Sequence, residues 1–242
     1  MKKVLLITFT LLIGISTNAQ GWWSSKKVKG NGKVITEKRP VDDFDDVSVG
    51  GSFDVILVDG KEGQVTIEGE ENIMPYIITE VKGGTLKIKH KDNVNIRTTR
   101  RLTVTVPFEK IDGISLGGSG NVIAKKRIKS DKVSFAIGGS GDIEADVDAN
   151  SVNSSIGGSG SIKLKGNTEN FKCSIAGSGS VKAYDLKTDN LKASIAGSGS
   201  VQTSVTHKID ANVVGSGSVY YKGNPKYIDT NSVGSGDVIK RD

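Results

Sequence analysis

Cysteine, proline and aromatic residues are all scarce in this sequence. Cys173 is the single cysteine among 242 residues, so no internal disulfide can form and a cysteine-based zinc site is excluded. Aromatic residues make up 5% of the chain, which predicts a core of aliphatic side chains. Only four prolines accompany 31 glycines, whereas a disordered Pro- and Gly-rich chain would have an excess of both. We therefore expect the glycines to occupy fixed structural positions.

Residues 1–19 have the pattern of a secretory signal peptide. Lys2 and Lys3 precede an apolar run over 4–15, and small residues precede a cleavage site after Ala19. The apolar run is shorter than the ~20 residues that a membrane-spanning helix needs, and no later segment is as long. We expect export to the periplasm, the cell surface or the extracellular space, with no integral membrane segment in the mature chain. No cysteine lies near the cleavage site, so the sequence predicts no lipid anchor.

The charge pattern argues against a nucleic-acid partner. Removal of Lys2 and Lys3 leaves 31 basic residues against 27 acidic ones, so the net charge falls from +6 to +4. The densest basic runs are Arg100–Arg101 and Lys125–Arg127, and neither contains aromatic side chains that could stack on bases. These charges predict a solvated surface, with some attraction to acidic polysaccharide or lipid headgroups as the alternative.

A tripeptide repeat organises the second half of the chain. Gly-Ser-Gly recurs every 18 to 21 residues, with its serine at Ser119, Ser140, Ser159, Ser178, Ser198, Ser216 and Ser235. Apolar residues alternate with polar ones before and after each tripeptide, which is typical of half-buried strands. The pattern predicts inward-facing columns such as Phe135, Ser154, Cys173, Ala193 and Ala211, with Lys172 and Ser174 outside.

A repeat of ~20 residues without helical periodicity predicts one coil of a parallel β-solenoid, because a four-stranded propeller blade needs about twice that length. Equivalent residues then stack ~4.8 Å apart, and small residues suit the crowded corners. Glycine tolerates a positive φ, so we predict strain from a β-branched residue at Gly179 and a small effect of Ser178→Ala.

Three functional interpretations of the corners fit less well. A calcium-binding β-roll has a nine-residue period, and phosphate-binding glycine loops lead into helices rather than strands. A lyase-like active site needs clustered carboxylates, but Asn121, Asp142 and Asp237 follow three corners while serine follows the four corners between Asp142 and Asp237.

The sequence divides into four segments. After the signal peptide, residues 20–40 are expected to be a tether, in which Trp22 and Trp23 form either a docking patch or a first contact with the main body. Residues 41–110 predict a β-rich N-terminal half that caps the solenoid, with a degenerate corner at 50–52 and a helical turn within 72–78. Residues 111–242 are expected to form the regular solenoid, and we expect 41–242 to be one continuous domain.

The chain resembles the bacterial "putative auto-transporter adhesin, head GIN domain" family, a domain of unknown function. The resemblance rests on Phe53–Val55 after Gly-Gly-Ser, on Leu86–Ile88, on Leu102–Pro107 and on the Gly-Ser-Gly corners. It covers residues 41–242 and implies an all-β, right-handed parallel β-helix in an exported protein. It supplies no catalytic or binding residue.

No catalytic site is evident from residue types. His90 and His207 lie in polar, lysine-containing segments and are expected at the surface, and Cys173 is expected to be a small core residue. We predict no catalytic, cofactor-binding or metal-binding residues and no cofactor. The predicted function is that of a non-enzymatic structural or adhesin-like module that binds a surface glycan, another polymer or an envelope protein. The alternative is a polysaccharide-active lyase or hydrolase on the same scaffold.

Overall fold

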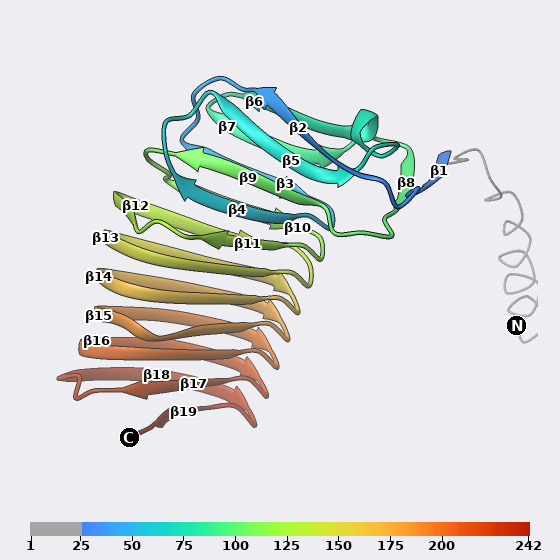
Figure 1. Ribbon diagram of the computed structural model, residues 1–242. Coiled ribbons are helices and arrows are strands. Elements are labelled where there is room, and N and C mark those ends of the chain that lie inside the picture. The colour runs from blue at the N-terminus through green and yellow to red at the C-terminus, as the bar shows by residue number, and fades with distance from the viewer. Residues whose placement is uncertain (1–25) are drawn as a thin grey trace, which may run out of the picture.

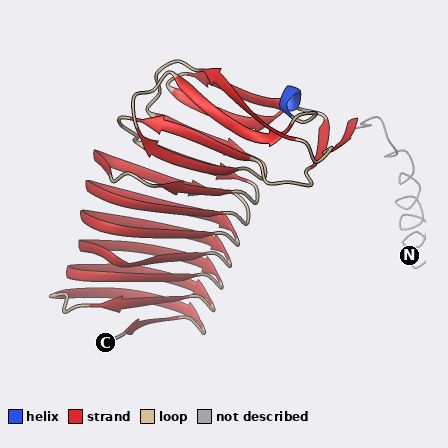
Figure 2. Cartoon of the chain, viewed as in Figure 1, coloured by secondary structure: helices blue, strands red, loops and turns tan. Residues whose placement is uncertain are grey.

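A computed structural model describes residues 26–242, and within them the chain is almost entirely β-strand (Figures 1 and 2). The described part forms one 17-stranded sheet and a separate pair, β1 with β8. The N-terminal strands are β1 (Lys26–Lys29), β2 (Val34–Pro40), β3 (Asp46–Gly50), β4 (Asp54–Asp59), β5 (Gln64–Glu70), β6 (Ile77–Lys82), β7 (Thr85–His90), β8 (Val94–Arg97) and β9 (Thr103–Phe108), with a 3₁₀ turn, η1 (Met74–Tyr76), before β6.

The C-terminal strands are β10 (Gly113–Gly117), β11 (Asn121–Ala124), β12 (Ile128–Ile137), β13 (Asp142–Gly158), β14 (Ser161–Gly177), β15 (Ser180–Gly197), β16 (Ser200–Gly215), β17 (Ser218–Lys222), β18 (Tyr227–Gly234) and β19 (Asp237–Lys240).

The regular half is the predicted solenoid. Each of β13 to β16 runs through a complete coil from one Gly-Ser-Gly corner to the next, and adjacent coils pair in parallel. Asp142 pairs with Ser161 and Gly158 with Gly177, a step of 19 residues per coil. Stacked coils of about 19 residues continue for about seven turns, which confirms the predicted β-solenoid (Figure 1).

The predicted core columns are confirmed by burial. Phe135, Ser154, Cys173, Ala193 and Ala211 are all buried at one position of successive coils. Lys172 beside Cys173 is exposed and Ser174 is partly exposed, so the predicted register of this coil holds. Burial raises the pKa of the Cys173 thiol to about 12, which keeps it protonated and unreactive at neutral pH.

Two different constraints act on the corner glycines, and the prediction for Gly179 was wrong in its cause. The positive φ belongs to Gly177, at +126°, and to every equivalent glycine before the serine except Gly139. Gly179 has no positive φ, but it has no room for a side chain, because a Cβ there would lie 2.6 Å from Ile156 Cγ2 and 2.8 Å from the Gly160 carbonyl oxygen. Backbone bonds link adjacent corners, as from Ser178 N to the Gly158 oxygen at 2.9 Å.

The N-terminal half extends the stack and then closes it. β3 and β4 pair in parallel with β10 and β11 on one side and with β7 and β9 on the other, so the predicted degenerate corner at 50–52 lies in the stack. Beyond them, β6 pairs antiparallel with β7, and β5 pairs antiparallel with β9. These antiparallel strands cover the end of the parallel stack (Figure 2).

The predicted tether over 20–40 was wrong for its described part. β2 pairs antiparallel with β5 along its whole length, from Val34 opposite Glu70 to Pro40 opposite Gln64. Arg39 fixes this strand further, because its guanidinium donates to the carbonyls of Ile77 and Met74 at 2.6 and 2.8 Å. The signal peptide, Trp22 and Trp23 lie outside the described residues.

Candidate functional site

A concavity of the regular half lies at the corner opposite the Gly-Ser-Gly tripeptides. This corner groove is open and shallow, with a volume of about 710 Å³. It crosses four coils from β12 to β15 and reaches Thr206 of β16. Its lining is polar throughout except at one alanine: Lys129, Ser130, Asp148, Ala149, Asn150, Asn167, Thr168, Glu169, Lys187, Thr188, Asp189 and Thr206.

Coil stacking arranges these residues in three columns. The floor is the register-aligned series Ser130, Ala149, Thr168 and Thr188. The residues before the floor positions form one rim, and those after form the other. The first rim is Lys129, Asp148, Asn167 and Lys187; the second includes Asn150, Glu169 and Asp189. Because coils are ~4.8 Å apart, four coils make a groove about 14 Å long, parallel to the solenoid axis.

Part of the floor is held by hydrogen bonds, whereas Thr188 Oγ1 is buried there without a hydrogen-bond partner among the described residues, and several rim groups are free. The Thr168 hydroxyl donates to the carbonyls of Asn150 and Asn170 at 3.3 and 3.2 Å. Thr206 Oγ1 donates to Asp189 Oδ1 at 2.6 Å. By contrast, four exposed rim side chains form no hydrogen bond or ion pair with another side chain in the described part of the chain: Lys129, Asn167, Glu169 and Lys187. The groove therefore offers amide, ammonium and carboxylate groups to a ligand.

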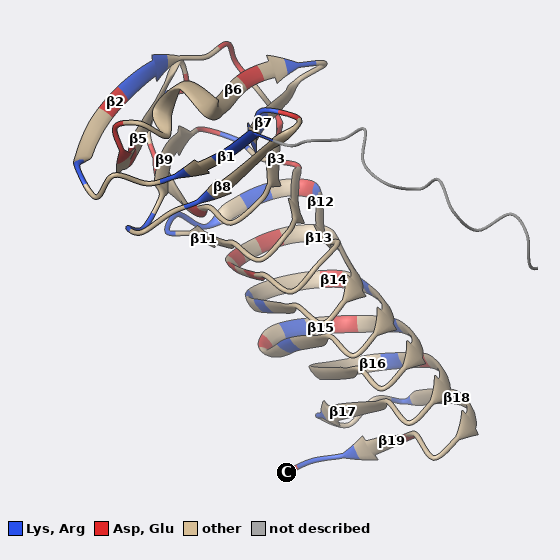
Figure 3. Ribbon diagram, turned by 90° about the vertical axis from the view of Figure 1, so that its right-hand side faces the viewer, with Lys and Arg blue, Asp and Glu red and all other residues tan. Residues whose placement is uncertain are grey.

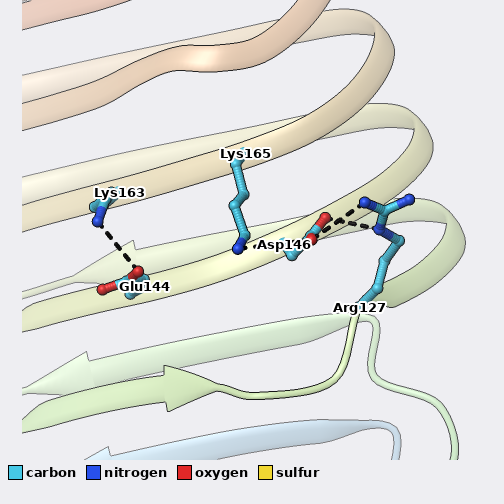
Figure 4. A network of polar contacts seen from close by, with 5 residues as sticks. All are labelled: Arg127, Glu144, Asp146, Lys163 and Lys165. Atoms are coloured by element: carbon cyan, nitrogen blue, oxygen red, sulfur yellow. Dashed lines mark hydrogen bonds and ion pairs between the residues drawn. The ribbon is translucent and has the colours of Figure 1, made fainter.

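The outer face after the Gly-Ser-Gly corners carries a ladder of ion pairs (Figure 4). Asp146 accepts from Arg127 Nε at 2.8 Å and lies 3.9 Å from Lys165 Nζ, while Glu144 pairs with Lys163 at 3.2 Å. Figure 3 shows segments of both charge signs on the upper coils of the solenoid. This part of the face is neutralised internally, so its charges are less available to a ligand.

The histidines and the post-corner acids do not assemble a catalytic constellation. Asp142 and Asp237 lie in one column, but Ser161, Ser180, Ser200 and Ser218 separate them, as the sequence predicts. His207 is exposed as expected and meets the Tyr227 ring edge to face at 5.4 Å. Within residues 26–242 no group of three or more His, Cys, Asp or Glu side chains is placed to hold a metal ion.

His90 departs from its predicted surface position. Its ring packs against Phe53 with centroids 4.6 Å apart, and its Nε2 atom is buried without a hydrogen-bond partner in the described structure. Burial lowers the pKa of His90, so the neutral imidazole is favoured. The reason is that β7 lies inside the cap stack, which its lysine-rich sequence does not indicate.

Glu70 is a buried carboxylate whose oxygens are fully engaged. It accepts hydrogen bonds from Thr99 Oγ1 at 2.6 Å, Thr99 N at 2.8 Å, Gly32 N at 2.7 Å and Arg100 N at 3.3 Å. Burial by itself raises the pKa of Glu70, but these donors outweigh it and lower the pKa to about 2. A carboxylate bound in this way holds the cap segments together and is not a free general acid or base.

The corner groove was not predicted from the sequence. Only the Gly-Ser-Gly corner has a constant composition, so the sequence pattern indicated no site at the second corner. The second corner varies in residue type but keeps the same step of 19 or 20 residues, as at Asp148, Asn167 and Lys187. Alignment of the polar residues midway between successive corners would have located these columns.

Comparisons with known proteins find one matching family and several solved structures with the same fold. A family model described as "Putative auto-transporter adhesin, head GIN domain" matches residues 43–225. A crystal structure titled a putative adhesin from Bacteroides fragilis aligns with a TM-score of 0.82 at 26% identity, over 88% of this chain and 100% of that chain.

Two structures from Parabacteroides distasonis are also similar. One, titled a putative lipid binding protein, has a TM-score of 0.76 at 28% identity, over 90% of this chain and 100% of that chain. The other, titled a putative adhesin, has a TM-score of 0.72 at 25% identity, over 89% and 100%. No curated protein matches the chain. Among residues 26–242, no helix is long and apolar enough to cross a membrane.

Proposed function

Because the chain belongs to the "putative auto-transporter adhesin, head GIN domain" family, we propose that it is an exported, non-enzymatic, adhesin-like protein that binds a cell-surface glycan in its corner groove. The family name suggests surface binding, and the N-terminal 19 residues have the pattern of an export signal. A surface glycan agrees with both.

One observation carries the choice of ligand. The corner groove crosses four coils and combines free amide, ammonium and carboxylate groups at its rims with a hydroxyl-containing floor. A sugar chain presents hydroxyl groups at every residue, each of which can donate and accept, so it suits a row of mixed donors and acceptors. An open groove along the axis also suits an extended polymer better than a compact metabolite.

A glycan array tests this proposal, with the purified protein and the double variant Asn167→Ala/Lys187→Ala as probes. Both side chains are exposed rim groups in register on adjacent coils, so the fold should tolerate their loss. We expect wild-type protein to bind a defined set of glycans and the double variant to bind at least about tenfold more weakly, which corresponds to ~1.4 kcal/mol.

A matched control is Asn153→Ala, which removes the same amide from another face of β13. It should bind like wild type, and thermal unfolding should show that all variants are folded. The proposal is wrong if wild-type protein binds no glycan, or if the groove variant retains wild-type affinity.

A further inference from the structure

A second polar surface lies on the last coils, on the face that follows the Gly-Ser-Gly corners. We call it the aromatic–cation cluster, formed by Tyr184, Tyr220, Lys222 and Arg241. Lys222 Nζ lies 5.4 Å from the centre of the Tyr184 ring, and Arg241 Cζ lies 4.8 Å from the centre of the Tyr220 ring. Both cationic residues are exposed, and both tyrosines are partly exposed.

The stacked coils bring these four residues together. Tyr221 pairs with Lys240, and Arg241 N donates to the Tyr221 oxygen at 2.8 Å, so Arg241 follows Lys222 in the same outward column. Ser204 lies in register with Lys222 on the preceding coil, and its hydroxyl donates to the Tyr184 carbonyl at 2.6 Å. The Lys222 side chain therefore extends across the coil of Ser204, and its ammonium group contacts the Tyr184 ring.

The cations of this cluster differ from those higher on the same face. Arg127, Lys163 and Lys165 are neutralised by Asp146 and Glu144 (Figure 4). Lys222 and Arg241 form no ion pair with any residue in 26–242, and aromatic rings hold them instead. A ring positions a cation but accepts few of its N–H groups, so these donors stay available for an anion.

We propose that the aromatic–cation cluster is a second glycan subsite, which binds the carboxylate or sulfate groups of an acidic polysaccharide. Arginine and lysine form charge-assisted hydrogen bonds with such oxyanions. Gln202 and Ser204, which face outward on the neighbouring coil, add hydrogen-bonding groups for sugar hydroxyls. The inference shares with the proposed function only the glycan class of the ligand, because the surface and its residues are different.

Binding of polygalacturonate oligosaccharides, measured by calorimetry at several NaCl concentrations, tests this subsite. We expect saturable binding that weakens with salt, since each neutralised anionic group releases counterions. The double variant Lys222→Gln/Arg241→Gln should bind at least about tenfold more weakly and show a smaller salt dependence. Neutral dextran should not compete.

Lys163→Gln is the matched control, because it removes one cation from the same face where Glu144 already neutralises it. It should bind within about twofold of wild type. Tyr220→Phe should also bind normally and Tyr220→Ala weakly, because the ring rather than the phenol positions Arg241.

Several results would overturn the inference: no binding of polygalacturonate, binding that the Lys222→Gln/Arg241→Gln variant retains, or binding of anionic phospholipid vesicles in place of the oligosaccharide. The groove variant Asn167→Ala/Lys187→Ala should keep polygalacturonate binding at the cluster. The experiments therefore distinguish an absence of glycan binding in the corner groove from an absence of binding at the aromatic–cation cluster.

Discussion

Glu70 shows how a single charged side chain can stabilise the irregular part of the fold. The loop before β2, the end of β5 and the loop at 99–100 all meet at its carboxylate. Gly30 permits this approach, because a Cβ at that position would overlap the Glu70 carboxylate. Charge-assisted hydrogen bonds from several backbone N–H groups compensate for the burial of the charge.

Glu70→Gln tests this role. The amide keeps the shape of the side chain but loses its charge, and its NH₂ group replaces one acceptor with a donor that faces other donors. We therefore expect the free energy of unfolding to fall by about 2 kcal/mol at neutral pH. The pKa of Glu70 is about 2 in the folded protein and about 4.5 in the unfolded chain. The ionised carboxylate therefore stabilises the fold above pH 4.5, and this contribution is lost as the pH falls toward 2.

The measurement is thermal unfolding of both proteins between pH 7 and pH 2.5. The gap between the two midpoints should narrow as the pH falls below about 4.5, because wild-type protein loses the contribution that the variant never had. An equal gap at every pH would show that Glu70 is not the stabilising carboxylate.

At the scale of the element, the corner is defined by two glycines with different constraints. Gly177 needs its left-handed backbone conformation and also lacks space, because a Cβ there would lie 2.5 Å from the Gly158 carbonyl oxygen, whereas Gly179 is constrained by space alone, beside Ile156 and the Gly160 carbonyl. Gly138 has neither constraint, because its φ is ordinary and a Cβ added there would meet no atom within 4 Å. Alanines occupy equivalent places in later coils, at Ala176 and Ala196.

Alanine substitution at these three glycines distinguishes the two constrained positions from Gly138, where glycine is not required. We expect Gly177→Ala and Gly179→Ala each to lower the free energy of unfolding by about 2–4 kcal/mol, through backbone strain and steric overlap at Gly177 and through steric overlap alone at Gly179. Gly138→Ala should change it by less than about 1 kcal/mol. Denaturant titration measures all three, and equal effects at the three positions would contradict the corner geometry.

Local patterns predicted the regular strands correctly, because the same alternation and the same corner tripeptide recur in every coil. Alternation fixed which side chains face inward, and the Gly-Ser-Gly spacing fixed the stacking, so Cys173 and its column were placed correctly. The pairing of β2 with β5 was missed, because only Ile35 of β2 packs against the core and charged residues dominate the rest. Long-range antiparallel pairing leaves little trace in such a sequence.

At the scale of the whole molecule, the order of strands in the stack differs from their order in the chain. The level formed by β3 and β4 lies between the level of β7 and β9 and the level of β10 and β11. The chain thus builds an inner level, forms the cap and then returns to begin the regular coils (Figure 1). The strands of all three levels have a similar alternation of apolar and polar residues, so the order of the levels could not be predicted from this pattern.

This architecture places both candidate binding surfaces on the regular coils and leaves the cap to close the other end. The corner groove spans β12 to β16, and the aromatic–cation cluster involves β15, β17 and the segment after β19. Stacking sets the spacing of side chains in both, at ~4.8 Å per coil.

Recovery of the bound ligand is the most direct test of the central claim, that the protein binds a surface glycan without transforming it. Purified protein is incubated with each glycan that it binds, and the retained and free ligand are analysed by mass spectrometry and by an assay for reducing ends. The account predicts retained glycan of unchanged mass, with no new reducing ends and no unsaturated products. Shortened or unsaturated products that disappear in an Asp142→Asn variant would contradict it and identify the protein as a polysaccharide-active enzyme.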